Sequence, residues 1–253
     1  MNGTSPSLAA PAASGQRVND TIPKLLLHNA DQYANRPALR HKDFGIWQTW
    51  SWSRLRDEVQ SFAIGLRKLG FERGETVAII GDNRPRLYAT FAAVQSIGGV
   101  AVPAYQDSVA DEMAYVLDHS EVKYAVVQDQ EQVDKVLSVA DRLPKLRKII
   151  YDEPRGLVDY DATNLHSFES VQQLGREEMR ANSGAAGWWL DEIAKGKGSD
   201  VSVMLYTSGT TGRPKGVMLT HANIVISAQN GNKFDNFTPE DTLLAYLPMA
   251  WVG

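Results

Sequence analysis

Short apolar runs alternate with longer amphipathic segments through most of this chain, and this alternation restricts the fold more than any other feature. The short runs are rich in Val, Ile and Tyr, as buried strands are, and the segments between them carry apolar residues at helical spacing. Such alternation predicts an α/β fold with a mostly parallel, twisted sheet flanked by helices on both faces. The expected strands are Thr76–Ile80, Val100–Pro103, Tyr124–Val127, Lys148–Tyr151 and Val201–Tyr206, and the expected helices are Arg86–Ser96, Val109–Leu117, Glu131–Ala140 and Leu165–Met179.

The residues before this alternation predict a smaller helix and hairpin unit. Helical spacing marks Thr21–Tyr33, and two short strands flank the turn Lys42–Gly45. Ser51 or Ser53 can cap a following helix that runs to Leu69 and is closed by Gly70. Apolar residues near the end, Leu243–Leu247, are expected to form a further strand.

Composition excludes several classes of protein. With 43% hydrophobic and 22% charged residues the chain reads as globular, and a net charge of −4 with interspersed signs gives no sign of a nucleic-acid surface. No apolar stretch reaches the length of a membrane span. The chain has no cysteine, and its five histidines show no metal-ligand spacing. Residues 1–19 are rich in Ala, Ser, Pro and Gly and are expected to be a disordered tail.

The segment Tyr206–Gly216, which follows the last predicted strand, has the chemistry of a phosphate-binding loop. Glycines let the backbone approach a ligand and turn its N–H groups inward, hydroxyl groups add donors or a magnesium ligand, and a lysine brings positive charge. Its position at the carboxyl end of a strand agrees, because ligands of open α/β sheets bind there. The simpler alternative is an ordinary loop between two elements.

Other nucleotide and nucleophile loops do not match this spacing. A Walker A loop has glycine before its lysine and Ser or Thr after it, whereas this chain has Pro214 and Gly216. No G-x-G-x-x-G follows a strand, and Ser208 lacks the preceding glycine of a hydrolase nucleophile elbow. A kinase or other P-loop ATPase is therefore disfavoured.

The segment closely resembles the phosphate-binding loop of the adenylate-forming (AMP-binding) enzymes, which include acyl-CoA synthetases, peptide-synthetase adenylation domains and luciferases. The similarity runs from about Asp20 to the end, and among subfamilies it is greatest to bacterial long-chain acyl-CoA synthetases (fatty acid–CoA ligases). The segments that carry it, besides the loop, are Asp82–Pro85, Ile97–Tyr105, His119–Glu121, Gln130–Lys135 and Leu219–Asn223.

This resemblance implies a reaction and a set of site residues. In the family, a carboxylate attacks the α-phosphorus of ATP to give an acyl-AMP and pyrophosphate, and a thiol, usually that of coenzyme A, then accepts the acyl group. Lys215 would stabilise charge on the leaving pyrophosphate, and Thr207 would be a ligand of Mg²⁺. Arg213 stands at a variable position of the motif and is expected to be exposed. The residues expected to bind ATP phosphates are Thr207, Ser208, Gly209, Thr210, Thr211, Gly212 and Lys215.

Several assignments have two interpretations at this stage. Thr210 and Thr211 could instead cap a helix that begins near His221. Trp251, where related enzymes often carry histidine, is either a wall of an acyl pocket or a core aromatic. The run Trp188–Leu190 could contact a membrane, although helical spacing with Ile193 favours the core. The expected partners are ATP, a fatty acid and coenzyme A, with no nucleic acid, in the cytoplasm or peripheral to a membrane.

The family comparison also gives an expectation about completeness. Family members are about twice this length or more, so residues 20–253 are interpreted as the N-terminal part of the AMP-binding large domain of an acyl-CoA synthetase for a medium- or long-chain fatty acid. An adenylation domain or acyl-AMP ligase that loads a carrier protein, and a non-catalytic nucleotide-binding module, remain open. Oligomeric state and acyl-chain identity do not follow from these residues.

The 253 residues alone are predicted not to adenylate a fatty acid, because the family's later magnesium- and ribose-binding motifs and its catalytic lysine are absent from them. An ATP–pyrophosphate exchange assay with fatty acids measures this. Robust exchange by the 253 residues would contradict the assignment of the chemistry.

Overall fold

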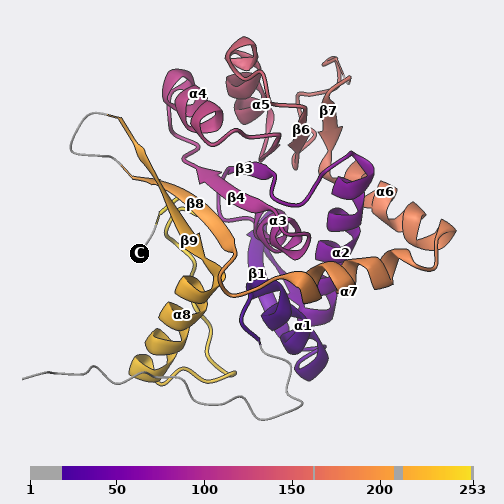
Figure 1. Cartoon of the computed structure of the whole chain (residues 1–253), viewed down its shortest axis with the longest axis vertical. Coiled ribbons are helices and arrows are strands. Elements are labelled where there is room, and N and C mark those ends of the chain that lie inside the picture. Colours follow the sequence, from indigo (N-terminus) through magenta and orange to yellow (C-terminus); the bar gives the residue numbers. More distant parts are fainter. Residues whose placement is uncertain (1–18, 162, 208–212, 252–253) are drawn as a thin grey trace, which may run out of the picture.

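A computed structural model describes residues 19–161, 163–207 and 213–251, and the expected tail at residues 1–19 lies outside this part except for Asn19. Its centre is a twisted sheet with helices on both faces (Figure 1). The predicted α/β fold with a mostly parallel sheet is confirmed.

Within the described residues the main sheet has seven strands in the order β7-β6-β5-β3-β4-β8-β9. Neighbouring strands are parallel except for the antiparallel pair of β8 and β9 at one edge. The strands are β3 (Thr76–Ile80), β4 (Val100–Ala104), β5 (Tyr124–Val127), β6 (Lys148–Tyr151), β7 (Leu165–Ser167), β8 (Val201–Thr207) and β9 (Lys215–Thr220).

Two apolar cores form because the strands present alternate residues to opposite faces. Val77 and Ile79 of β3 pack on one side, and Ala78 and Ile80 pack on the other. The first face is covered by α1 (Ile22–Gln32), α2 (Trp52–Lys68), α3 (Pro85–Ser96), α6 (Phe168–Ala181) and α7 (Ala185–Lys195), and the second by α4 (Ala110–His119) and α5 (Gln130–Leu137).

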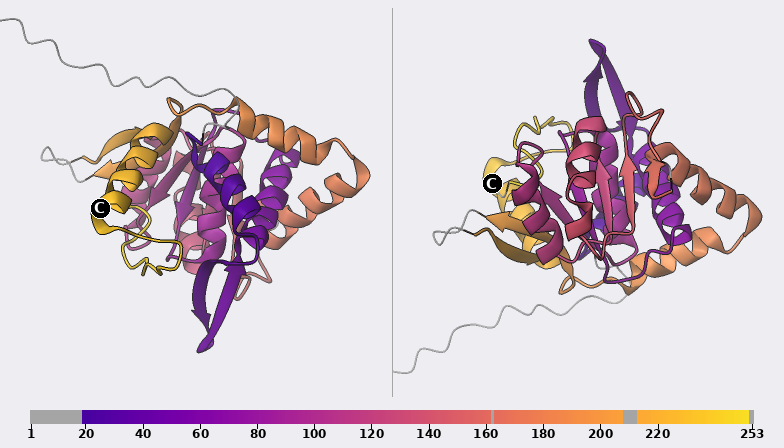
Figure 2. Two further views of the ribbon diagram at one scale, coloured as in Figure 1. Left: turned by 90° about the horizontal axis from the view of Figure 1, so that it is seen from below. Right: turned by 90° about the horizontal axis from the view of Figure 1, so that it is seen from above.

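A separate two-stranded hairpin projects from the body of the molecule, as the indigo ribbon in Figure 2 shows. It joins β1 (Pro37–Asp43) to β2 (Ile46–Ser51) through Phe44 (φ 45°) and Gly45 (φ 79°). Two successive residues at positive φ are typical of the tight turns that match strand twist. Ser51 then caps α2 by accepting a hydrogen bond from the N–H of Arg54, as the sequence predicts.

Helices α2 and α6 approach each other closely because glycines face the contact. A Cβ at Gly65 would lie 2.0 Å from the carbonyl oxygen of Val171, and one at Gly175 would lie 1.9 Å from that of Ser61. Beside them the rings of Phe62 and Phe168 stack with centroids 4.0 Å apart. Any side chain at either glycine would force the two backbones apart.

Three local features differ from the expectations. The segment expected to be one helix, Leu165–Met179, begins as strand β7 and becomes α6 only at Phe168, where Ser167 provides the N-cap. Strand β9 was not expected. Leu243–Leu247 is not a strand in the described residues; it is irregular chain with exposed leucines. Among the helices that the structure describes, none is long and apolar enough to cross a membrane.

Replacing Gly175 by Ala is predicted to destabilise the protein by about 1–3 kcal/mol, the usual cost of overpacking. This loss should exceed the gain of about 1 kcal/mol that alanine brings to a helix interior. Urea denaturation followed by circular dichroism measures it. Gly187→Ala in α7 is the matched control, because a Cβ there meets nothing within 4 Å, and it should not destabilise the protein. Equal effects of the two changes would contradict the role of Gly175.

Candidate active site

The carboxyl ends of the central parallel strands lie side by side along one edge of the sheet, perpendicular to the edge formed by β9. The predicted site residues that the structure describes lie at these carboxyl ends. Strands β4 and β8 pair in parallel with Ala101 opposite Val203. Thr207, the last residue of β8, therefore lies at the same edge as Ala104, the last residue of β4. Edges of this kind are where open α/β sheets bind ligands.

Strands β8 and β9 form an antiparallel hairpin, and its connection is the predicted phosphate loop. In its register Thr207 pairs directly with Lys215. Paired residues of an antiparallel ladder lie on the same face, so the Thr207 hydroxyl and the Lys215 ammonium group flank the base of the loop together. Both residues are exposed. The predicted ligands Ser208, Gly209, Thr210, Thr211 and Gly212 lie outside the described residues.

Gly216 leaves space for the ring of Tyr206 on this hairpin. The two residues pair across the strands, and a Cβ at Gly216 would lie 3.2 Å from Cζ of Tyr206. The hydroxyl of Tyr206 is 2.7 Å from Nδ1 of His119 on α4. Burial raises the pKa of the Tyr206 phenol, so the hydroxyl remains protonated at neutral pH.

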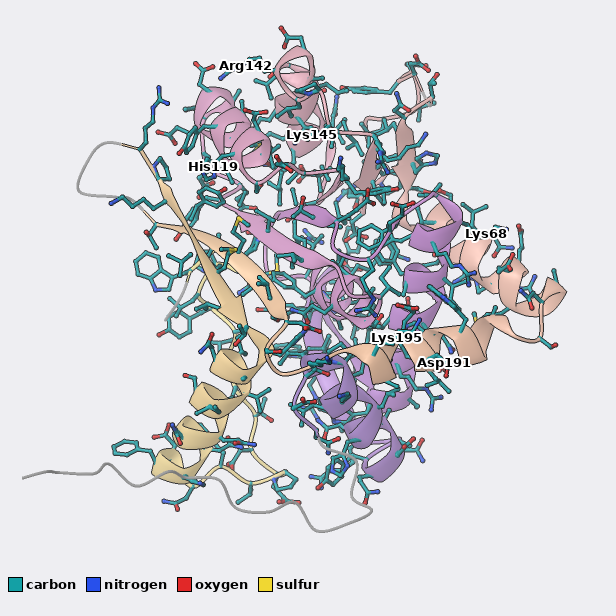
Figure 3. All side chains as sticks on the ribbon, in the orientation of Figure 1. Lys68, His119, Arg142, Lys145, Asp191 and Lys195 are labelled. Atoms are coloured by element: carbon teal, nitrogen blue, oxygen red, sulfur yellow. The ribbon has the colours of Figure 1, made fainter. Side chains whose placement is uncertain are left out.

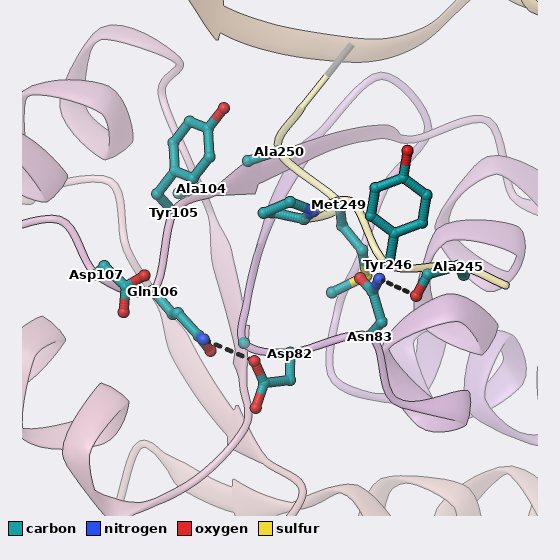
Figure 4. Close-up of a pocket in the computed structure, with 12 residues that line it drawn as sticks. Asp82, Asn83, Ala104, Tyr105, Gln106, Asp107, Ala245, Tyr246, Met249 and Ala250 are labelled. Atoms are coloured by element: carbon teal, nitrogen blue, oxygen red, sulfur yellow. Dashed lines mark hydrogen bonds between the residues drawn. The ribbon is translucent and has the colours of Figure 1, made fainter. Parts of the chain in front are cut away.

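A pocket of about 310 Å³ lies beside the hairpin, at the carboxyl ends of β3 and β4 (Figure 4). The chain near residue 245 covers it, held by Asn83, whose side-chain N–H groups donate to the carbonyl oxygens of Ala245 and Leu247, each at 2.8 Å. The pocket is lined by Gly81, Asp82, Asn83, Ala104, Tyr105, Gln106, Asp107, Ala245, Tyr246, Pro248, Met249 and Ala250.

A polar network fixes the floor of this pocket. Gln128 accepts a hydrogen bond from the N–H of Asp82, and the amide of Gln106 donates to the Asp82 carboxylate, both at 2.6 Å. Gly81 is required because a Cβ there would lie 2.6 Å from Cβ of Gln128. The carboxylates of Asp82 and Asp107 make this pocket unsuited to phosphate, so it does not compete with the hairpin as the predicted phosphate site.

Two tryptophan assignments can be compared with the structure. Trp189 is buried, and its indole N–H donates to the hydroxyl of Ser96 at 2.8 Å. The core interpretation is confirmed for this residue, while Trp188 is partly buried beneath the Arg67 guanidinium. Trp251 is 56% exposed and follows the pocket residue Ala250. It is not a core aromatic in the described chain, and its place in an acyl pocket remains a prediction.

Helix α8 (His221–Asp235) begins where the sequence places it, and Thr220 is its cap. The Thr220 hydroxyl accepts from the N–H of Asn223, and the Asn223 side chain accepts from the N–H of Thr220. Capping by Thr210 or Thr211 is therefore wrong. His221 is buried, its Nδ1 accepts from the N–H of Ile22, and burial lowers the pKa of its imidazole. It joins α8 to the start of α1.

Sequence reasoning did not find the pocket or the contacts of His119. Asp82 and Asn83 follow the predicted strand Thr76–Ile80 after Gly81, and this position, with the family resemblance of Asp82–Pro85 and His119–Glu121, was the available signal. Among the described residues no group of three His, Asp or Glu side chains is arranged to hold a metal ion.

The fold, the strand-edge site and the loop sequence agree with one family. Residues 26–253 match the family described as AMP-binding enzyme, and the chain belongs to that family. Long-chain-fatty-acid–CoA ligases are among its relatives. The ACSBG2 protein of Xenopus laevis is 30% identical over 238 residues, covering 92% of this chain and 31% of its own length. The Homo sapiens ACSBG2 protein is 30% identical over 243 residues, covering 94% and 35%.

Solved structures show the same fold at lower sequence identity. Acetoacetyl-CoA synthetase of Streptomyces lividans matches 91% of this chain and 35% of its own with a TM-score of 0.74 and 20% identity. A long-chain-fatty-acid–CoA ligase (FadD1) of Archaeoglobus fulgidus matches 87% and 41%, with a TM-score of 0.68 and 20% identity. The anthranilate–CoA ligase AuaEII, solved with anthranoyl-AMP, matches 83% and 36%, with a TM-score of 0.64 and 20% identity. The chain spans about a third of the length of the first relatives.

Proposed function

We propose that this chain belongs to an ATP-dependent acid–thiol ligase that activates a medium- or long-chain fatty acid and transfers it to coenzyme A. In the first step a carboxylate oxygen forms a bond to the α-phosphorus of ATP, and the bond to the bridging oxygen breaks to release pyrophosphate. In the second step the thiolate of coenzyme A attacks the acyl carbonyl and AMP leaves. Family membership and the long-chain relatives support this reaction, and the proposed location is cytoplasmic.

The observation that carries the proposal is the pairing of Thr207 with Lys215 across the base of the loop. A hydroxyl and an ammonium group face the same side at the carboxyl edge of a parallel sheet, next to a Gly- and Thr-rich connection. Preorganised groups of this kind stabilise charge that develops on a leaving group. Lys215 would bind pyrophosphate oxygens in ATP and hold them as the bond to the α-phosphorus breaks.

The donor set also fits magnesium. Mg²⁺ prefers oxygen ligands and keeps several waters while bridging phosphates, so one exposed hydroxyl, that of Thr207, is a suitable protein ligand. When bound, the ion would neutralise phosphate charge. Thr207 would orient the phosphates, and the Lys215 ammonium group would neutralise part of the negative phosphate charge that the ion leaves.

A second candidate keeps the adenylation step and changes the acceptor to the thiol of a carrier protein. The anthranilate–CoA ligase of the same fold holds an acyl-adenylate, an intermediate common to both outcomes. Single-turnover transfer from acyl-AMP to coenzyme A or to a carrier protein separates them. Long-chain CoA ligases among the relatives favour coenzyme A.

Contact with a lipid surface is part of the proposal, through the tip of the β1–β2 hairpin. Phe44, Ile46 and Trp47 are 85%, 66% and 64% exposed and lie at the turn of the hairpin, which projects from the body of the molecule (Figure 2). Lys42 pairs with Trp47 and, with Arg40, lies on the same face of the hairpin. Apolar rings at a tip with cations behind them complement an anionic bilayer.

Lys215→Ala in the full chain is predicted to weaken ATP binding about 10- to 100-fold, since a charge-assisted contact is worth about 1.5–3 kcal/mol. Isothermal titration measures the ATP dissociation constant of the variant and of the unchanged chain. Lys233→Ala, which removes another exposed lysine in the last turn of α8, is the control and should bind ATP normally. Unchanged ATP affinity in Lys215→Ala would overturn the proposed role of the loop.

The double change Phe44→Ser and Trp47→Ser is predicted to reduce binding to phosphatidylglycerol-containing vesicles about tenfold or more, because each buried apolar side chain contributes about 1.5–3 kcal/mol. Vesicle co-sedimentation measures it, and binding should weaken as salt screens the cations. Phe234→Ser removes an equally exposed ring on α8 and should leave binding unchanged. Equal sedimentation of the double variant and the parent would contradict membrane contact through the hairpin.

A further inference from the structure

Helix α4 contacts both strands that lead into the phosphate loop. The hydroxyl of Tyr115 donates to the carbonyl oxygen of Pro214, which immediately precedes β9, with a distance of 3.1 Å. One helical turn further on, Nδ1 of His119 lies 2.7 Å from the hydroxyl of Tyr206 on β8. Figure 3 shows His119 on α4 beside the β8–β9 hairpin.

These contacts form one cluster rather than two separate ones. The rings of Tyr115 and His119 have centroids 5.5 Å apart, and His119 meets the ring of Tyr206 edge-on at 5.7 Å. The guanidinium of Arg213 lies 5.7 Å from the Tyr115 ring centroid. Arg213 is exposed, as the sequence predicts. Its guanidinium nevertheless lies over the Tyr115 ring, so this residue, two positions before Lys215, is beside α4.

Each residue that α4 holds is the direct neighbour of a proposed ligand of ATP. Tyr206 precedes Thr207, and Pro214 precedes Lys215. The two hydrogen bonds therefore act one residue away from the hydroxyl and from the ammonium group. Both bonds come from a single rigid helix, so they restrict the position of Thr207 and Lys215 relative to each other as well as to the sheet.

The packing of α4 does not depend on these two polar contacts. The helix is held to the sheet by four buried side chains, those of Met113, Ala114, Val116 and Leu117. His119 is exposed and Tyr115 is half-buried, and the Tyr115 hydroxyl and His119 Nδ1 are directed to the hairpin. Removing the polar atoms would leave the apolar contacts of the helix in place.

We propose that Tyr115 and His119 are positioning residues for the β- and γ-phosphates of ATP, acting through Pro214 and Tyr206 on the strands that flank the loop. This inference rests on the proposed function, in which Thr207 and Lys215 bind those phosphates. A nucleotide without them gains nothing from the correct placement of these two side chains. The contribution of α4 should therefore appear in ATP affinity and be absent from AMP affinity.

The test compares two tyrosine hydroxyls that make the same bond in different places. Tyr115→Phe removes the 3.1 Å bond to Pro214, and Tyr124→Phe removes a 3.1 Å bond from a hydroxyl to the carbonyl oxygen of Leu69, at the amino end of β5. Tyr115→Phe in the full chain is expected to raise the dissociation constant for ATP about 2- to 12-fold, the effect of losing one neutral hydrogen bond. The dissociation constant for AMP should not change.

His119→Ala with Tyr206→Phe extends the test to the second bond. Each single change should weaken ATP binding and spare AMP binding, and the double change should cost less than the two together because both remove one contact. Thermal unfolding of every variant accompanies the titrations. Equal effects of Tyr115→Phe and Tyr124→Phe, or parallel losses of ATP and AMP affinity, would overturn the positioning role.

Failure of this inference is distinguishable from failure of the proposed function. If Lys215→Ala weakens ATP binding while Tyr115→Phe and His119→Ala do not, Lys215 binds phosphate and α4 does not position it. If Lys215→Ala has no effect, the proposed function itself fails, and the positioning role fails with it.

Discussion

The candidate site depends on the pairing of β8 with two different neighbours. On one side β8 is parallel to β4, which brings its end to the edge where β3 and β4 also end; on the other it is antiparallel to β9. The parallel pair gives the location, and the antiparallel pair brings the chain back so that Lys215 stands opposite Thr207. Neither pairing alone would place a hydroxyl and an ammonium group together at the carboxyl ends of the parallel strands.

Much of the fold could be predicted because its signals are local. The buried strands appear as apolar runs, and the cap at Ser51 and the turn at Gly70 (φ 89°) mark the ends of α2. The local features that differ from the expectations are segments whose conformation depends on contacts with residues distant in the sequence. Strand β9 has no buried residue to mark it in the sequence, and it forms because β8 offers an edge with which it can pair. Leu243–Leu247 has the composition of a strand. In the described chain, however, the Asn83 side chain donates hydrogen bonds to the carbonyl oxygens of Ala245 and Leu247, where a strand would accept them from a neighbouring strand.

The site divides in the same way. The types and spacing of Thr207 and Lys215 could be recognised in the sequence, because the proposed phosphate loop is built from neighbouring residues. The contacts that support them were not. His119 and Tyr206 are 87 positions apart, and Tyr115 and Pro214 are 99 positions apart. Bonds over such separations follow from the order of strands in the sheet, where α4 crosses back beside β8, and no periodicity in the sequence encodes them.

The aromatic ring that lies against a glycine gives the site an internal reporter. The α-protons of Gly216 lie close to the face or edge of the Tyr206 ring, since Cζ would be only 3.2 Å from a Cβ at this position. Ring currents displace the NMR resonances of protons so placed. Tyr206 directly precedes Thr207, and Gly216 directly follows Lys215. Small rotations of the Tyr206 ring on nucleotide binding would therefore be visible in a glycine-selective spectrum without any attached label.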